Sequence, residues 1–121
     1  MQSGETETPT EGFTLATSID QVKEDSMIGV TIKGKPILLS RIGDNFYAMD
    51  AVCSHLYGYL PKGTLQEKTV ICPVHKAQFD LTNGKVVKNV PRMIKYASHK
   101  EASDLTTYRV KVVGSNLLIA L

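Results

Sequence analysis

The sequence lacks the features that define several common protein classes. No stretch approaches the roughly 18 apolar residues that a membrane-spanning helix needs, and the first residues have neither the basic nor the apolar region of a signal peptide. A glycine-rich dinucleotide fingerprint is also missing, so no built-in reductase is expected. The 121 residues, 42% of them hydrophobic, suit one ordinary domain. We therefore expect a cytoplasmic protein without a membrane anchor.

Cysteine and histidine are scarce, but they are concentrated in two short segments. The chain has two cysteines and three histidines, and residues 53–55 (Cys-Ser-His) and 72–75 (Cys-Pro-Val-His) hold all but one of them. Thiolate and imidazole side chains suit zinc, iron or copper. Each segment is short enough for one loop to bring its Cys and its His to a common centre. The spacing therefore predicts a metal site.

The order of these four side chains bears on which metal they bind. Two cysteines and two histidines also satisfy a tetrahedral structural zinc, but a zinc finger usually takes its cysteines from one loop and its histidines from a helix. Here each loop offers one Cys followed by one His. That order suits a Rieske 2Fe-2S centre, in which two thiolates bind one iron and two imidazoles bind the other. Structural zinc remains an alternative, as does a single disulfide, although a disulfide would not need a histidine beside each cysteine.

The residues around the two segments strengthen the Rieske interpretation. They match C-x-H-x4-L-x2-G and C-P-x-H-x-A-x-F-D-x3-G at every fixed position, with Leu60, Gly63, Ala77, Phe79, Asp80 and Gly84 beyond the four expected ligands. In this the chain resembles the soluble Rieske-type ferredoxins. The resemblance is specific over residues 53–84 and weaker over residues 13–52 and 106–121. It implies a Rieske-type 2Fe-2S cluster, with Cys53 and Cys72 on one iron and His55 and His75 on the other.

The resemblance also implies that the protein carries electrons and is not itself an enzyme. Rieske oxygenases need a second, mononuclear iron held by two histidines and a carboxylate. After His55 and His75 are used, only His99 is left, so this chain cannot assemble that site alone. We expect a monomeric one-electron carrier that passes electrons between a reductase and a terminal acceptor such as an oxygenase. A zinc-stabilised interaction domain and a redox-sensing Rieske protein are the alternatives.

The pattern of apolar residues predicts an all-β protein. From Phe13 onward, short β-rich runs alternate with turn signals, which is typical of a β-sandwich or small barrel. The runs predict strands over residues 27–33, 37–41, 46–49, 69–71, 106–113 and 117–121. Turns are expected at residues 34–36, 43–45, 83–84 and 114–116, where glycine or asparagine tolerates a positive φ. Ser18 is a possible helix N-cap, with one or two short turns following up to Asp25.

The domain organisation follows from composition and from the resemblance. Residues 1–12 are polar, rich in Thr and Glu and without periodic apolar positions, so we expect a mobile tail before a single Rieske domain over residues 13–121. The resemblance implies a cluster-binding subdomain over about residues 51–91, formed by hairpin loops of an antiparallel sandwich. A third loop at Asn89-Val90-Pro91 either shields the cluster or merely ends a strand. Residues 93–104 form a long connection in which His99 is expected to be solvated.

Two positions bear on the reduction potential. High-potential relatives place a hydroxyl-bearing Ser and Tyr where this chain has Ala77 and Phe79. Neither side chain can donate a hydrogen bond to the cluster, so the resemblance implies a potential in the lower half of the Rieske range. Lys76 stands where glycine is common, and its positive charge acts modestly in the opposite direction.

Charge is unevenly distributed along the chain. The net charge of +2 conceals an asymmetry. Residues 53–100 have eight Lys or Arg and two acids, whereas residues 1–12 have three Glu and no base. The basic side chains nearest the predicted ligands are Lys62, Lys68, Lys76, Lys85, Lys88 and Arg92. They could steer an acidic redox partner toward the cluster, or form only a solvated surface. Nucleic acid is not expected, because no aromatic residues are interleaved with the basic ones.

Overall fold

A computed structural model describes residues 11–54, 58–74, 76–98 and 101–121. Its elements in chain order are β1 (Thr14–Ser18), η2 (Ile19–Gln21), β2 (Ser26–Ile32), β3 (Lys35–Ile42), β4 (Asn45–Asp50), η3 (Leu60–Lys62), β5 (Thr64–Gln66), β6 (Thr69–Ile71), β7 (Gln78–Asp80), β8 (Val86–Lys88), α1 (Arg92–Ser98), β9 (Thr107–Tyr108), β10 (Val110–Val113) and β11 (Asn116–Ile119). None of the helices in these ranges is long and apolar enough to cross a membrane.

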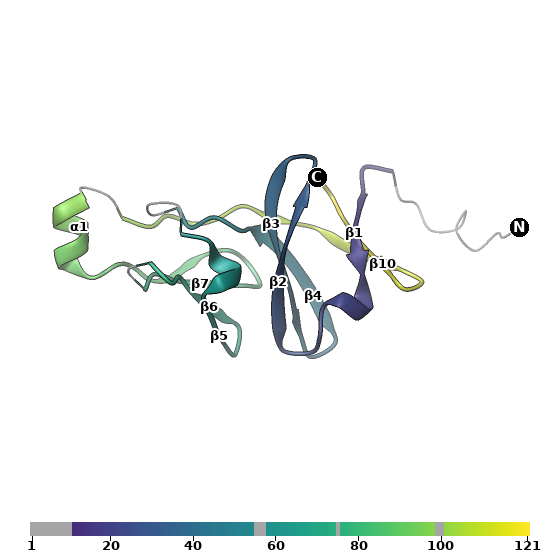
Figure 1. Cartoon of the computed structure of the whole chain (residues 1–121), viewed down its shortest axis with the longest axis horizontal. Coiled ribbons are helices and arrows are strands. Elements are labelled where there is room, and N and C mark those ends of the chain that lie inside the picture. The colour runs from purple at the N-terminus through teal and green to yellow at the C-terminus, as the bar shows by residue number, and fades with distance from the viewer. Residues whose placement is uncertain (1–10, 55–57, 75, 99–100) are drawn as a thin grey trace, which may run out of the picture.

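The strands form three antiparallel sheets, which confirms the mostly β fold. The terminal sheet has the order β1-β11-β10, the central sheet β2-β3-β4-β9, and the hairpin sheet β5-β6-β7-β8. Figure 1 shows the hairpin sheet and α1 on one side of the central sheet, with β1 and β10 on the other. The central sheet therefore separates the two ends of the molecule.

Strands β3 and β4 show how the central sheet contributes to a buried core on each of its two faces. Successive side chains of a strand point to opposite faces, so a strand covered on both faces becomes a continuous apolar run. In β3, Ile37 and Leu39 belong to one buried cluster, the terminal core, whereas Leu38 belongs to another, the hairpin core. In β4, Ala48 and Met49 divide in the same way. The two cores share this sheet as a common wall.

Tight turns set the register of the central sheet. Lys33 and Gly34 join β2 to β3 with φ of 53° and 79°, and a two-residue hairpin with positive φ at both positions matches the natural twist of the strands. The turn lies one residue earlier than expected, and Lys35 and Pro36 already belong to β3. Gly43, at φ 60°, begins the turn between β3 and β4 where the sequence predicts it.

The expected strands are largely present, although their ends differ. The strand at 69–71 has the predicted bounds, and the predicted 106–113 strand is divided into β9 and β10. The three-residue strands β5, β7 and β8, and also β1, were missed, because so few residues show no clear alternation. Ser18 does precede a helical turn, η2, but its hydroxyl makes no capping hydrogen bond. The expected tail, residues 1–12, lies almost wholly outside the described residues.

Residues 93–104, expected only to form a long connection, include a helix that the sequence did not predict. Residues Arg92–Ser98 form the helix α1, and Pro91 stands directly before its first residue. Proline suits the start of a helix because its φ is already near the helical value and its missing N–H would have no partner there. Neither earlier interpretation of Pro91, as a cluster shield or a strand terminator, anticipated this helix.

Ser40 provides a test of the packing between the sheets. Its side chain is fully buried in β3, and its hydroxyl has no hydrogen-bond partner. A buried hydroxyl without a partner costs roughly 1 kcal/mol or more. We expect Ser40→Ala to raise the free energy of unfolding by about 1 kcal/mol. Ser26→Ala is the matched control: the Ser26 hydroxyl donates to the Lys23 carbonyl at 2.6 Å, so that variant should lose stability in the same urea titration.

Candidate metal centre

Two loops carry the cysteines, and the same backbone hydrogen bond closes both. In the first loop the Cys53 N–H donates to the Gly58 carbonyl at 2.7 Å, and in the second the Cys72 N–H donates to the Ala77 carbonyl at 2.8 Å. Each bond therefore joins a cysteine to the residue five positions later. The two loops therefore share one type of closing hydrogen bond.

Antiparallel pairing places each loop at the tip of a hairpin. The first loop is closed by a bridge between Val52 and Tyr59 and by a hydrogen bond from the Leu60 N–H to the Ala51 carbonyl. The second connects β6 to β7, whose last pair is Ile71 with Gln78. Both cysteines thus follow directly after ordered, paired backbone, which fixes where each thiol begins.

The two loops meet at the Cys72 sulfur. A Cβ added to Gly58 would lie 2.5 Å from Cys72 Sγ and 3.2 Å from Val74 Cγ2, so the glycine allows the backbone of the first loop to approach the thiol of the second. The Val74 N–H also donates to Cys72 Sγ at 3.4 Å. Cys53 and Cys72 are both fully buried and are not joined in a disulfide. Two buried sulfurs on facing loops suit a soft metal centre.

The predicted histidines lie outside the described residues. This holds for His55 and His75, the expected ligands, and also for His99. Within the described ranges no three Cys, His, Asp or Glu side chains are grouped as a metal site. The structure therefore brings together the loops of the two cysteines, and the ligand role of all four residues stays a prediction.

The other motif residues have structural roles that explain their identity. Leu60, Ala77 and Phe79 are fully buried in the hairpin core. A side chain at Gly63 would collide with the Ile71 carbonyl of β6, so only glycine permits this approach. Gly84 has φ 77° and packs against the Leu105 carbonyl.

Asp80 organises the turn that follows β7. Its carboxylate accepts hydrogen bonds from the Thr82 N–H at 2.8 Å and from the Thr82 hydroxyl at 2.6 Å. Such a bond from an aspartate to the backbone two residues on favours a turn. The spacing of the second motif therefore reflects the construction of a hairpin as well as the predicted metal binding by Cys72 and His75.

Three polar side chains near the loops were not singled out by sequence. The Asn89 amide oxygen accepts hydrogen bonds from the Val90 and Ala102 N–H groups, and its nitrogen donates to the Ala102 carbonyl. Asp104 accepts a hydrogen bond from the Val86 N–H, and Ser54 binds the main chain of Ser103. Apart from Val90, their partners lie 13 to 49 residues away, so no local pattern could have revealed those bonds.

Asp50 fixes the strand that leads into the first loop. It is the last residue of β4, and its carboxylate accepts a hydrogen bond from the Tyr108 hydroxyl at 2.6 Å. Lys35 Nζ lies 3.9 Å from the same carboxylate. Burial, and then the hydrogen bond to Asp50, raises the pKa of Tyr108. The hydrogen bond with Tyr108, and then the charge of Asp50, raises the pKa of Lys35.

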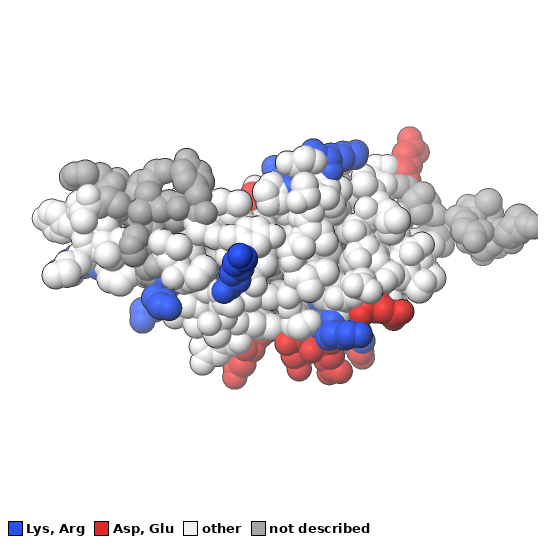
Figure 2. Space-filling view, viewed as in Figure 1, with Lys and Arg blue, Asp and Glu red and all other residues white. Residues whose placement is uncertain are grey.

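Helix α1 places apolar side chains in solvent at this end of the molecule. Ile94 packs against the hairpin core, whereas Met93 and Tyr96 are 80% and 78% exposed. Figure 1 shows α1 at the opposite end of the molecule from β1 and β10. Among the coloured residues in Figure 2, this end of the visible face shows Lys and Arg but no Asp or Glu.

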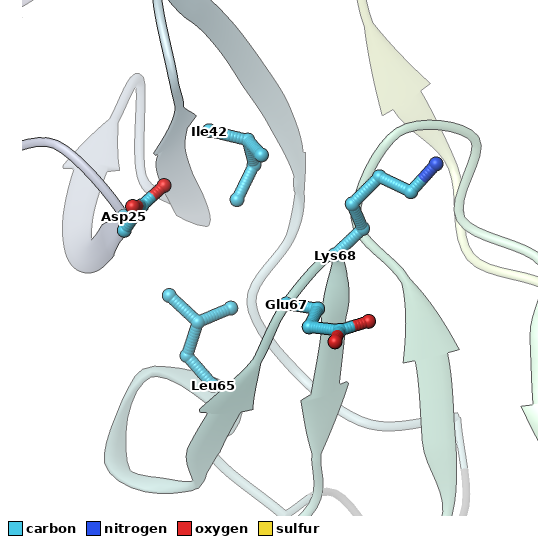
Figure 3. A pocket seen from close by; sticks show the side chains of 5 residues that line it. All are labelled: Asp25, Ile42, Leu65, Glu67 and Lys68. Atoms are coloured by element: carbon cyan, nitrogen blue, oxygen red, sulfur yellow. The ribbon is translucent and has the colours of Figure 1, made fainter.

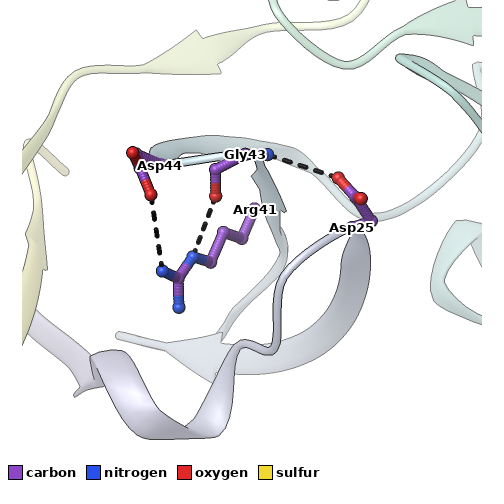
Figure 4. Close-up of polar contacts among 4 residues, drawn as sticks. All are labelled: Asp25, Arg41, Gly43 and Asp44. Carbon is purple, nitrogen blue, oxygen red and sulfur yellow. Dashed lines mark hydrogen bonds and ion pairs between the residues drawn. The ribbon is translucent and has the colours of Figure 1, made fainter.

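A pocket elsewhere does not form a second site. It has a volume of about 470 Å³ and lies between the turn region around Asp25 and Ile42 and the β5-β6 hairpin (Figure 3). Asp25, the carboxylate nearest the central sheet in this pocket, accepts a hydrogen bond from the Gly43 N–H at 3.2 Å. Arg41 donates to the Gly43 carbonyl and lies 3.9 Å from Asp44 (Figure 4). These contacts stabilise the β3-β4 turn.

Comparison with known proteins identifies related sequences. Residues 13–109 match the model of the Rieske [2Fe-2S] domain. The chain is 39% identical over 87 residues to the 3-phenylpropionate/cinnamic acid dioxygenase ferredoxin subunit of Shigella boydii, covering 70% of this chain and 72% of that protein. It is 27% identical over 112 residues to the ferredoxin component of a naphthalene 1,2-dioxygenase system of Pseudomonas aeruginosa, covering 93% and 98%.

Solved structures share the fold. The ferredoxin of carbazole 1,9a-dioxygenase from Nocardioides aromaticivorans IC177 superposes with a TM-score of 0.74 at 24% identity, covering 89% of this chain and 96% of that one. A chain from a complex of reduced oxygenase and oxidized ferredoxin in carbazole 1,9a-dioxygenase also gives a TM-score of 0.74, at 22% identity, covering 89% and 92%.

The raised pKa of Tyr108 predicts a loss of stability in alkali. Because the folded state holds this phenolic proton more tightly than the unfolded chain, its contribution is complete below the ordinary pKa of 10.0 and is lost as pH rises through the higher folded value. The difference in free energy of unfolding between the native protein and Tyr108→Phe, measured by urea unfolding, should therefore shrink as pH rises above 10.0. Tyr96→Phe, at an exposed position, should show no such trend.

Lys76 predicts a gain in stability on substitution by glycine. Its φ is 65°, in the left-handed region, which costs a residue with a Cβ roughly 1 kcal/mol. After allowing for the greater freedom of glycine in the unfolded chain, Lys76→Gly should raise the free energy of unfolding by about 0.5 kcal/mol. Lys88→Gly, in strand β8, removes the same charge and should lower it. A loss of stability in both variants would contradict this account of Lys76.

Proposed function

The chain belongs to the Rieske [2Fe-2S] domain family, and on that basis we propose that Cys53 and Cys72 hold one iron of the cluster while His55 and His75 hold the other. The protein is an electron-carrying ferredoxin and is not itself catalytic. When bound, the cluster accepts and releases one electron. The family assignment favours this cofactor over the structural zinc that the ligand types alone would allow.

The meeting of the two loops carries the ligand proposal. The Cys72 sulfur lies against the Gly58 backbone of the opposite loop, and both cysteines are buried. A metal held between the loops would be shielded on the cysteine side by the hairpin core. The Val74 N–H donates a hydrogen bond to Cys72 Sγ, and a hydrogen bond to a ligand sulfur is one way in which a protein tunes such a site.

We also propose that the acceptor is the terminal oxygenase of a ring-hydroxylating dioxygenase system. Related proteins are ferredoxin components of such systems, and one solved complex pairs a ferredoxin with its oxygenase. A reductase would supply the electron. The protein would work as a monomer in the cytoplasm, where thiols stay reduced and remain available as metal ligands.

The surface near the loops suggests the chemistry of the docking partner. Four of the six predicted basic residues are exposed near the loops: Lys62, Lys76, Lys88 and Arg92. Lys68 and Lys85 lie at the opposite end of the hairpin sheet, so the expectation that they flank the loops is wrong. Met93 and Tyr96 add apolar contact area on α1. A partner with an apolar patch surrounded by carboxylates would complement both features, since charge steers the encounter and buried apolar side chains stabilise it.

The charge arrangement predicts how variants transfer electrons. Replacing both Lys76 and Lys88 by Glu should lower the rate of transfer to the oxygenase about tenfold at low salt, and the difference should shrink as salt is added. Lys23→Glu, at an exposed position next to Val22 of the terminal core, is the control and should have little effect. The assay combines the protein with the oxygenase and the reductase of a naphthalene 1,2-dioxygenase system and measures the rate of product formation. No transfer by the native protein would contradict the proposed acceptor.

The buried residues beside the second loop predict the reduction potential. Ala77 and Phe79 are fully buried and cannot donate hydrogen bonds to the cluster sulfurs. We expect a midpoint potential in the lower half of the Rieske range of roughly −150 to +300 mV. Ala77→Ser adds a donor and should raise the potential, whereas Ala48→Ser, in the terminal core, should not. A native value well above zero in a redox titration would contradict this prediction.

A further inference from the structure

A serine inside the first loop connects it to a distant part of the chain. Ser54 stands between Cys53 and His55, and its hydroxyl donates to the Ser103 carbonyl at 2.6 Å. The same oxygen accepts a hydrogen bond from the Ser103 N–H at 2.8 Å. One side chain therefore satisfies both main-chain groups of a residue 49 positions away. We propose that Ser54 is a positioning residue that holds the first cluster loop in place.

The segment that Ser54 binds is itself well anchored. Ala102 is held by the Asn89 side chain, with its N–H 3.0 Å from the amide oxygen and its carbonyl 3.1 Å from the amide nitrogen. The Asp104 carboxylate accepts a hydrogen bond from the Val86 N–H at 2.9 Å, at the start of β8. The Leu105 N–H donates to the Gly84 carbonyl at 2.8 Å. Ser54 thus ties the loop to backbone that is joined to the hairpin sheet.

This connection also places α1 relative to the first loop. The helix lies between Asn89 and Ala102, and the Asn89 side chain closes that stretch of chain at its base. Ser54 binds the next residue, Ser103. A partner protein that contacts Met93 or Tyr96 on α1 would therefore contact a segment that is held to the loop with the two predicted ligands. Without the Ser54 hydroxyl, the first loop would lose its hydrogen bonds to Ser103, in the segment that follows α1.

The role rests on the proposed function, because it concerns the loop that would supply Cys53 and His55. Residues that hold a metal ligand in place also orient it. Removing such a residue commonly lowers the metal affinity by a factor of about 10 to 100. A loop with fewer constraints samples more arrangements of its ligands. Removing the Ser54 hydroxyl should therefore spread the cluster over several environments and speed its release.

The test compares three variants of the full-length protein carrying its cluster. Ser54→Ala removes both hydrogen bonds, and iron release to a chelator should be about tenfold faster than in the native protein. Its reduced EPR signal should also be broader. Ser54→Thr keeps the hydroxyl and should restore both properties. Ser103→Ala is the matched control, because only the main chain of Ser103 takes part in the two bonds, and it should behave like the native protein.

The outcomes separate this inference from the proposed function. A native protein with no Rieske EPR signal would overturn the proposed function. If the native signal is present, equal iron release and equal line width in Ser54→Ala would overturn only the role of Ser54. Faster release without a change in line width, or with no rescue by threonine, would indicate a general loss of stability and would likewise overturn the positioning role.

Discussion

The close approach of two loops at the Cys72 sulfur is the constraint on which the cluster end of the molecule depends. Gly58 must lack a side chain, because a Cβ there would lie 2.5 Å from that sulfur. Matching backbone bonds close the two loops, one from Cys53 to Gly58 and the other from Cys72 to Ala77. Short strands of three residues suffice because the hairpin core is packed beneath them.

The rest of the fold supplies a rigid base for that contact. The central sheet is covered on both faces, so Ile37 and Leu38, neighbours in β3, belong to different cores. The hydrogen bond between Asp50 and Tyr108 holds the end of β4, between Met49 and Ala51, which both belong to the hairpin core. An electron carrier benefits from such rigidity, because a preorganised site changes little when its charge changes.

The sequence allowed the cofactor, the β fold and the loop positions to be predicted, because Cys, His, Gly and Pro have strong and specific structural preferences. The strand at 69–71 and the turn at Gly43 follow from local patterns. The helix α1 and the roles of Asn89 and Ser54 do not, since they depend on tertiary contacts. A seven-residue helix shows little periodicity, and the partners of Ser54 are the main-chain groups of a residue whose side-chain type is irrelevant to the bond.

The most direct test of the account is the metal and sulfide content of the anaerobically purified protein, together with its EPR spectrum before and after reduction with dithionite. We predict two irons and two sulfides per chain, with a signal only after reduction and the low average g value expected of nitrogen-ligated iron. One zinc per chain and no EPR signal would contradict the account and would leave a structural metal domain in place of an electron carrier.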